Sequence, residues 1–235
     1  ITENPDAIFV SKHDETGKYS LYRYDVDNRQ VIEKIEIDQG CCALGYSISH
    51  EGVFESYVHF DGRENIVYLS NIEKRVASII SLNFPDANSR IESHSKDKNK
   101  FVMFISSPTE PGTYYLLDLL SNKLEMLDYI YQQVDVDSLA TTKIIEYKVR
   151  DDVQVQGFVT VPKNIPQGKK LPTIILPHDG PHDRSHWRFD PIVQFLVSQG
   201  YATLEINYRG STGYGKEFKD LADEEWANKV IEDIN

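Results

Sequence analysis

The chain has 235 residues, of which 40% are hydrophobic and 26% charged, a composition typical of a globular protein with enough apolar residues for a core. A net charge of −12 and a pI near 5.0 argue against nucleic acid or an anionic membrane as a partner, because phosphate binding needs clustered Lys and Arg. No apolar run approaches the ~20 residues that a membrane span requires.

Residues 1–130 repeat themselves with a period of about 46 residues. Apolar strand-like runs begin at Ile8, Phe54 and Phe101. A second strand follows each run and ends in a turn, at Asp27-Asn28, at Asn71–Lys74 and at Ser121-Asn122; these turns lead into Val31, Val76 and Leu124. Asn, Asp and Gly supply the backbone geometry that tight hairpins need. The pattern predicts consecutive small antiparallel sheets.

This first half shows no sustained 3.6-residue apolar period, whereas aromatic and β-branched residues are abundant. Four short strands per repeat favour the blades of a β-propeller over a solenoid. The alternative is a β-sandwich whose spacing matches by chance. We expect a partial propeller of about three blades over residues 1–135, with the remaining blades elsewhere in the polypeptide, because known propellers have at least about four.

Cys41 and Cys42 are adjacent, so a bridge between them would be badly strained if they lie on a strand. Two free thiols fit a reducing compartment, and we therefore expect a cytoplasmic location. The chain begins at Ile1 with no charged-then-apolar leader, and a strand is already expected at Ile8–Ser11. We expect the chain to be a fragment, cut at both ends.

In residues 136–235 the repeat stops and the pattern of apolar residues changes. Ile144–Val149 and Gln154–Val161 read as a hairpin joined at Asp151-Asp152, and Pro162–Lys170 as an exposed loop. We then expect a strand at Thr173–Leu176 buried on both faces, a helix at Pro191–Ser198 capped by Gly200, a strand at Tyr201–Ile206, a helix starting near Tyr214 and another at Leu221–Ile234. This order is that of the first half of a mostly parallel α/β sheet.

Ligands bind beyond the carboxyl ends of the strands in open α/β sheets. His178–Arg188 and Arg209–Gly215 occupy these positions. Gly180 can expose its backbone N–H, and Pro181 should hold Gly180 in an extended conformation. A rigid donor beside an imidazole is suited to stabilising an oxyanion. The competing interpretation is a tight turn that serves only to reverse the chain.

Three longer motifs identify a resemblance: LPTIILPHDGPH, W-x-F-D-P-x-x-Q-F-L-x-x-x-G-Y-A and N-Y-R-G-S-T-G-Y-G-x-x-F. Over about residues 144–235 the chain resembles the prolyl oligopeptidase family of serine peptidases, above all its acylaminoacyl-peptidase and dipeptidyl-peptidase branches. Members of this family place a β-propeller before an α/β-hydrolase domain. The resemblance therefore implies a partial propeller over residues 1–135 and the N-terminal part of an α/β-hydrolase domain over residues 136–235.

The resemblance also implies residue roles. The family's His-Gly-Gly-Pro loop, which helps to form the oxyanion hole, corresponds here to His178, Asp179, Gly180 and Pro181. Asp179 replaces the usual glycine, and a carboxylate pointing inward would repel an oxyanion. We expect its side chain to face solvent or a cation such as Arg184 or Arg188. The Arg209–Gly215 loop is expected to give structural support.

The family's mechanism needs a serine in a Gly-x-Ser-x-Gly turn, then an aspartate and a histidine. No such turn occurs here: Ser185, Ser198 and Ser211 stand in other contexts, and Asp190 and Asp220 come too early in the chain to be the triad acid. We therefore expect no catalytic residue in this chain, a triad beyond Asn235, and no activity from the fragment alone. The implied function is hydrolysis of short peptides by acyl transfer, without a cofactor.

Three alternatives remain open. His178, His182 and His186 recur every four residues and could hold zinc on one helical face, but Gly180-Pro181 disfavours such a helix, so no metal is expected. The chain could instead be a non-catalytic propeller that binds proteins or peptides, or part of an esterase of the same fold. The expected partner is a short peptide substrate, and a homo-oligomer stays open because truncated sheets expose strand edges.

Overall fold

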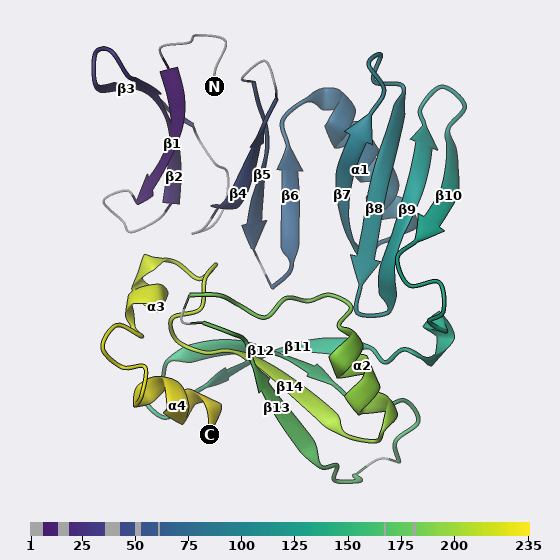
Figure 1. The fold of residues 1–235 in the computed structure, drawn as a ribbon, viewed down its shortest axis with the longest axis vertical. Helices are drawn as coiled ribbons and strands as arrows, with labels where there is room; N and C mark the ends of the chain where they lie inside the picture. The colour runs from purple at the N-terminus through teal and green to yellow at the C-terminus, as the bar shows by residue number, and fades with distance from the viewer. Residues whose placement is uncertain are drawn as a thin grey trace.

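The computed structural model describes residues 7–13, 19–35, 43–49, 53–60, 62–166, 168–180 and 182–235. Within them, three antiparallel sheets follow one another along the chain, and a mixed sheet follows the third. Figure 1 shows the first three sheets standing side by side and the fourth lying across their ends. Cys41, Cys42 and Pro181, on which part of the sequence interpretation rests, lie outside the described residues.

The first two sheets are meanders in which each strand pairs with its neighbour in sequence. The first contains β1 (Ala7–His13), β2 (Tyr19–Asp25) and β3 (Gln30–Ile35); the second contains β4 (Ala43–Ile48), β5 (Phe54–Phe60) and β6 (Glu64–Tyr68). Asp25 closes the β2–β3 turn by accepting hydrogen bonds from the backbone N–H and the side chain of Asn28. This Asx-type turn is the one expected at the first landmark.

Helix α1 (Asn71–Asn83) stands where the repeat predicts a turn and a strand through Val76, so that prediction is wrong. Ser70 caps the helix by accepting a hydrogen bond from the Glu73 N–H. Val76 and Ile80 are fully buried, one helical turn apart, so the segment has the 3.6-residue period thought absent from this half. The segment forms a helix and not a strand because the helix packs this apolar stripe against the third sheet.

The third sheet packs against α1 and forms the largest core of the first half. It contains β7 (Asn88–His94), β8 (Lys100–Ser107), β9 (Glu110–Asp118) and β10 (Lys123–Tyr129) in the order β10-β9-β8-β7. Phe101, Met103 and Ile105 alternate along β8 and are fully buried against the helix. This sheet has the four strands expected of the repeat, and Asn122 takes a positive φ of 52° in its last turn.

The fourth sheet contains β11 (Thr142–Lys148), β12 (Gln154–Thr160), β13 (Thr173–Pro177) and β14 (Ala202–Asn207), in the order β11-β12-β14-β13. Only β13 and β14 are parallel, and α2 (Pro191–Ser198) connects them. The β11–β12 hairpin, the exposed loop after it and α2 confirm the expectations for this region. Asp190 caps α2 through the Ile192 and Val193 N–H groups.

Two expectations for the second half are wrong. Strand β13 is not buried on both faces: within the described sheet it is an edge strand that pairs only with β14, and Ile175 is 40% exposed. Leu221–Ile234 is not one helix, because residues 221–228 are successive turns between α3 (Lys216–Asp220) and α4 (Lys229–Ile234). Glu224 has a φ of +63°, which interrupts the helical path.

None of the helices in the described ranges is long and apolar enough to cross a membrane.

Candidate functional site

Two loops meet at the carboxyl ends of the neighbouring strands β13 and β14. The β13 loop covers residues 178–190 and the β14 loop residues 208–215. Hydrogen bonds hold the loops together. The Thr212 N–H donates to the Asp183 carbonyl at 3.0 Å, and the Ser185 N–H donates at 2.7 Å to the side-chain oxygen of Asn207, the last residue of β14. The sequence placed both loops at this edge of the sheet, and the structure brings them into direct contact.

His178 opens the β13 loop and is held by the β14 loop. Its ring stacks on Tyr208, with ring centres 4.3 Å apart, and its Nε2 lies 2.7 Å from Ser211 Oγ. The Ser211 hydroxyl donates to the Tyr208 carbonyl at 2.6 Å, which uses its only proton. With the hydroxyl proton used in this way, Nε2 is the donor in the contact with Ser211. Burial lowers the pKa of His178, so the neutral ring is favoured.

This arrangement decides what the Ser211–His178 pair can do. Ser211 is completely buried and its hydroxyl is bound to a backbone carbonyl. His178 points a protonated nitrogen at it, so the ring cannot take the proton that a nucleophilic serine must lose. The pair fastens one loop to the other.

The tip of the β13 loop is open. Asp179 and Gly180 are exposed, and a Cβ added to Gly180 would meet no atom within 4 Å. The Gly180 carbonyl accepts a hydrogen bond from the Tyr208 hydroxyl at 2.9 Å, whereas its N–H makes no hydrogen bond with the described residues. Asp179 faces solvent, as expected. Gly180 has a φ of +64°, so the extended conformation expected before Pro181 is wrong.

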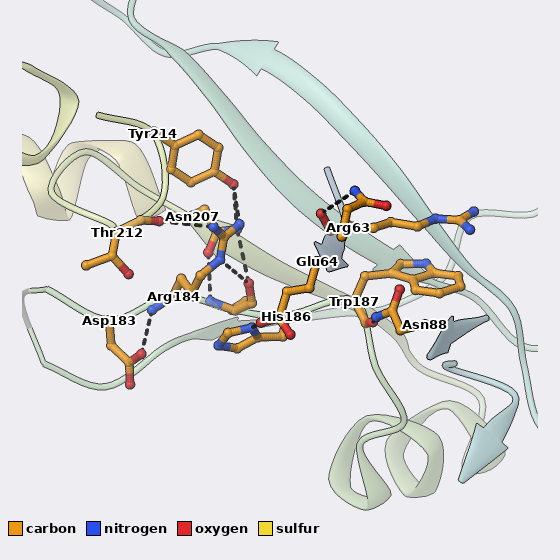
Figure 2. Close-up of polar contacts among 12 residues, drawn as sticks. Arg63, Glu64, Asn88, Asp183, Arg184, His186, Trp187, Asn207, Thr212 and Tyr214 are labelled. Carbon is orange, nitrogen blue, oxygen red and sulfur yellow. Dashed lines mark hydrogen bonds and ion pairs between the residues drawn. The ribbon is translucent and has the colours of Figure 1, made fainter. Parts of the chain in front are cut away.

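Arg184 is the buried centre of the same loop and is 4% exposed. Its guanidinium carbon lies 3.3 Å from the centre of the Phe60 ring and 4.9 Å from that of Tyr214. It also donates to the Thr212 carbonyl and to the Tyr214 hydroxyl, each at 3.1 Å (Figure 2). Because Phe60 ends strand β5, this arginine joins the second sheet to both loops of the fourth.

Three more contacts tie the β13 loop to the earlier sheets, and Figure 2 shows their residues. His186 Nδ1 lies 2.6 Å from Glu64, and this hydrogen bond lowers the pKa of the Glu64 carboxyl. Arg63 stacks over the Trp187 ring at 4.0 Å, and the Asn88 side chain donates to the Trp187 carbonyl at 3.2 Å. These partners could not be predicted from the sequence, because they lie about a hundred residues from the loop and belong to no motif.

Arg209 anchors the β14 loop from beneath. Its guanidinium forms two bonds to Asp151, at 2.7 and 2.8 Å, and two to Asp233, at 2.7 and 2.8 Å. The Asp233 carboxylate also accepts the Arg209 backbone N–H. Hydrogen bonds from Arg209 lower the pKa of Asp151 to about 2. The supporting role expected of Arg209–Gly215 thus has a specific basis: a bidentate ion network joins the β11–β12 turn, the loop and α4.

Glu205 is a half-buried acid on β14 that sequence reasoning missed. No hydrogen bond or ion pair of the described residues involves its carboxylate. Burial, and secondarily the negative charge of Asp190, raise the pKa of Glu205 to about 7. Alternation along the strand was a usable signal, because Thr203 and Asn207 on the same face are fully buried.

The three regularly spaced histidines go to different partners. His178 binds Ser211, His182 lies 3.2 Å from the Gly210 carbonyl, and His186 binds Glu64. Over the ranges that the structure describes, no three His, Cys, Asp or Glu side chains are grouped so that they could hold a metal ion.

Comparison with known proteins agrees with this geometry. The model of the prolyl oligopeptidase family matches residues 187–235. Dipeptidyl peptidase family member 6 of Caenorhabditis elegans is 27% identical over 191 residues, which cover 73% of this chain and 24% of that protein. The acylamino-acid-releasing enzyme of Mus musculus is 35% identical over 68 residues, covering 28% of this chain and 9% of the enzyme. The chain therefore spans a minor part of the length of these relatives.

Solved structures of this kind share the fold. Prolyl oligopeptidase B from Galerina marginata, solved with a 35-residue substrate, superposes with a TM-score of 0.72 at 15% identity. The match covers 98% of this chain and 33% of that enzyme. The three antiparallel sheets and the mixed sheet thus have the arrangement found in part of such an enzyme.

Proposed function

Because the chain is related to the prolyl oligopeptidase family, we propose that it is part of a serine peptidase that hydrolyses short peptides by acyl transfer. Residues 1–135 would supply about three blades of a propeller, and residues 136–235 the first part of the α/β-hydrolase domain. Among the described residues, no sheet combines a strand from β1–β10 with a strand from β11–β14, which supports this division.

In this proposal the tip of the β13 loop contributes to the oxyanion hole. The observation that carries it is Gly180: its N–H makes no hydrogen bond with the described residues, its surroundings are open, and its carbonyl is fixed by Tyr208. Oxyanion stabilisation needs a donor that is already oriented before charge develops. His178 and Arg184 hold the loop on either side of that donor, and Asp179 keeps its carboxylate in solvent.

The nucleophile is proposed to lie outside residues 1–235. These residues contain no Gly-x-Ser-x-Gly turn, and Ser211, which does contact a histidine, is buried and bound to the backbone. A serine-directed fluorophosphonate should therefore label the longer native product and leave the 235-residue chain unlabelled. Labelling of this chain would refute the placement of the nucleophile, and a native product that never labels would favour a non-catalytic binding module.

The role of Gly180 can be tested in the native product with Gly180→Ala. A side chain at a φ of +64° is strained by roughly 1–2 kcal/mol, and relief of this strain would move the N–H. We expect kcat on a peptide substrate to fall about tenfold or more with little change in KM. Gly168→Ala is the matched control, because Gly168 also has a positive φ and open surroundings but lies in the exposed loop before β13. Equal kcat for both variants would exclude Gly180 from the oxyanion hole.

A further inference from the structure

A cavity of about 550 Å³ lies between the second and third sheets and the second half of the β13 loop. Arg90 and Phe104 line it from the third sheet, and Trp187, Arg188 and Phe189 line it from the loop. The volume falls within the range of about 300–1,000 Å³ that is usual for small-molecule sites. The loop that lines it also carries the proposed oxyanion tip at Asp179 and Gly180.

The charged groups of the cavity are unequally matched. Both carboxylates of the cavity already have hydrogen-bond partners: Glu64 is bound by His186, and Asp190 accepts hydrogen bonds from the first N–H groups of α2. Arg188 makes no hydrogen bond or ion pair with the described residues. Arg90 forms an ion pair with Glu92 through its Nε alone, at 2.6 Å, and its guanidinium carbon lies 4.2 Å from the centre of the Phe104 ring.

What remains in the cavity is therefore a surplus of guanidinium donors. The protein as a whole carries a net charge of −12, and the two arginines of the cavity are matched in number by Glu64 and Asp190, so an anion would be held by the unused guanidinium donors and not by an excess of positive charge. Guanidinium groups bind carboxylates through paired hydrogen bonds. The rings of Phe104, Trp187 and Phe189 provide apolar walls next to these donors.

We propose that this cavity binds the C-terminal carboxylate and the apolar last side chain of a short peptide. Arg188 and Arg90 would hold the carboxylate, and the aromatic walls would hold the side chain. The assignment rests on the proposed function, in that it names the class of peptide which that function would act on: short peptides with a free carboxyl end and an apolar last residue.

The test is calorimetric titration of the chain, and in parallel of the longer native product, with the tripeptide Ala-Ala-Phe and with its C-terminal amide. We expect the amide to bind at least about tenfold more weakly, because charge-assisted hydrogen bonds are lost. In Arg188→Gln and Arg90→Gln the free acid should weaken by a similar factor while the amide changes little, so that the preference for the acid disappears. Arg75→Gln, at an exposed position on α1, is the matched control and should keep the preference.

Three outcomes would overturn the assignment: equal binding of acid and amide, an unchanged preference in both arginine variants, or binding of inorganic phosphate as tight as that of the peptide. Fluorophosphonate labelling keeps this test separate from the proposed function. If the native product binds the free acid selectively but is not labelled, the assignment of the cavity stands and the proposed peptidase function is refuted. If the native product is labelled but does not prefer the free acid, the peptidase function stands and the assignment of the cavity is refuted.

Discussion

The loops after β13 and β14 leave the same edge of one sheet but are built in opposite ways. The β14 loop is closed: Ser211 is completely inaccessible, and Arg209 is 2% exposed. Its polar groups are used inside the protein. The β13 loop instead exposes Asp179 and Gly180 at its tip, and the Gly180 N–H makes no hydrogen bond with the described residues. One loop is an anchor, and the other presents groups to a ligand.

The comparison shows how an exposed loop can be kept rigid. The β13 loop contains only one strongly buried charge, Arg184, and that residue is fastened both to the β14 loop and to Phe60 of the second sheet. A donor that stabilises a developing charge must be oriented in advance by its surroundings. The order of the open tip is therefore supplied by the closed loop and by a hairpin that lies far away in sequence.

The largest effect expected from breaking the anchor is that of Arg209→Met. Asp233, whose side chain is 1% exposed, would be left as a buried carboxylate without its cation. Removing one partner of a buried ion pair costs about 3–5 kcal/mol in free energy of unfolding. Urea denaturation measures this loss, with Asp151→Asn as the control, because the Asp151 side chain is 43% exposed and its loss should cost clearly less. Equal losses in the two variants would mean that the network is not anchored at Asp233.

Glu205→Gln tests the half-buried acid on β14, the strand from which the closed loop leaves. The pKa of this acid is raised from 4.5 to about 7, so the folded protein holds a proton more tightly than the unfolded chain does. Its contribution to stability is complete below about pH 4.5 and is lost as the pH rises through 7. The variant should match the wild type near pH 4 and exceed it near pH 8, by at most about 3 kcal/mol.

Urea midpoints at the two pH values measure this difference for Glu205→Gln. Glu217→Gln, at an exposed position on α3, is the control and should change stability by less than about 0.5 kcal/mol at either pH. A pH-independent effect at Glu205 would mean that water reaches its carboxylate.

Arg184→Met tests whether the β13 loop depends on its anchor. The variant keeps much of the apolar stem but loses the hydrogen bonds to Thr212 and Tyr214 and the stacking on Phe60. We expect a loss of about 2–3 kcal/mol, with faster hydrogen exchange of the loop amides than in the wild type. Arg188→Met, in the same loop but exposed, should cost less than about 0.5 kcal/mol. Unchanged loop exchange in Arg184→Met would show that the tip is ordered without Arg184.

The site divides into a part that local sequence predicts and a part that it cannot. The positions of His178–Gly180 and Arg209–Gly215 follow from two apolar strands joined by a helix, because parallel neighbours end at the same edge. The contact of Phe60 with Arg184 joins residues 124 positions apart in the chain, and neither residue stands in a pattern that names the other. Contacts of this kind are set by how the sheets pack.

Two misjudged elements show different limits. For α1 a helix signal was present, since Ser70 and Glu73 have capping-box spacing at the start of the apolar stripe of Ile72, Val76 and Ile79. The regular repeat nevertheless favoured a strand. For β13 no local signal exists, because Ile174-Ile175-Leu176 would read the same in the centre or at the edge of a sheet. The first error came from weighting a long-range period above a local one; the second needs the neighbouring strands.

The smallest expected effect is at the contact where the two loops touch, between His178 and Ser211. Ser211→Ala removes one hydroxyl and leaves His178 Nε2 without its partner, whereas the Tyr208 carbonyl still accepts the backbone N–H of residue 211; the loss should be about 1 kcal/mol. The pH dependence adds an independent readout. Because burial lowers the pKa of His178 below 6.5, the unfolded chain binds the proton more tightly, so stability is complete above about pH 6.5 and falls as the pH drops towards the lowered value. His178→Gln should remove this fall, which runs opposite to that of Glu205 and is best measured in the Glu205→Gln background. If stability instead rose on acidification in that background, the folded protein would bind the His178 proton more tightly than the unfolded chain does. His178 would then be charged in the fold, and its contact with Ser211 would not be part of the closed anchor.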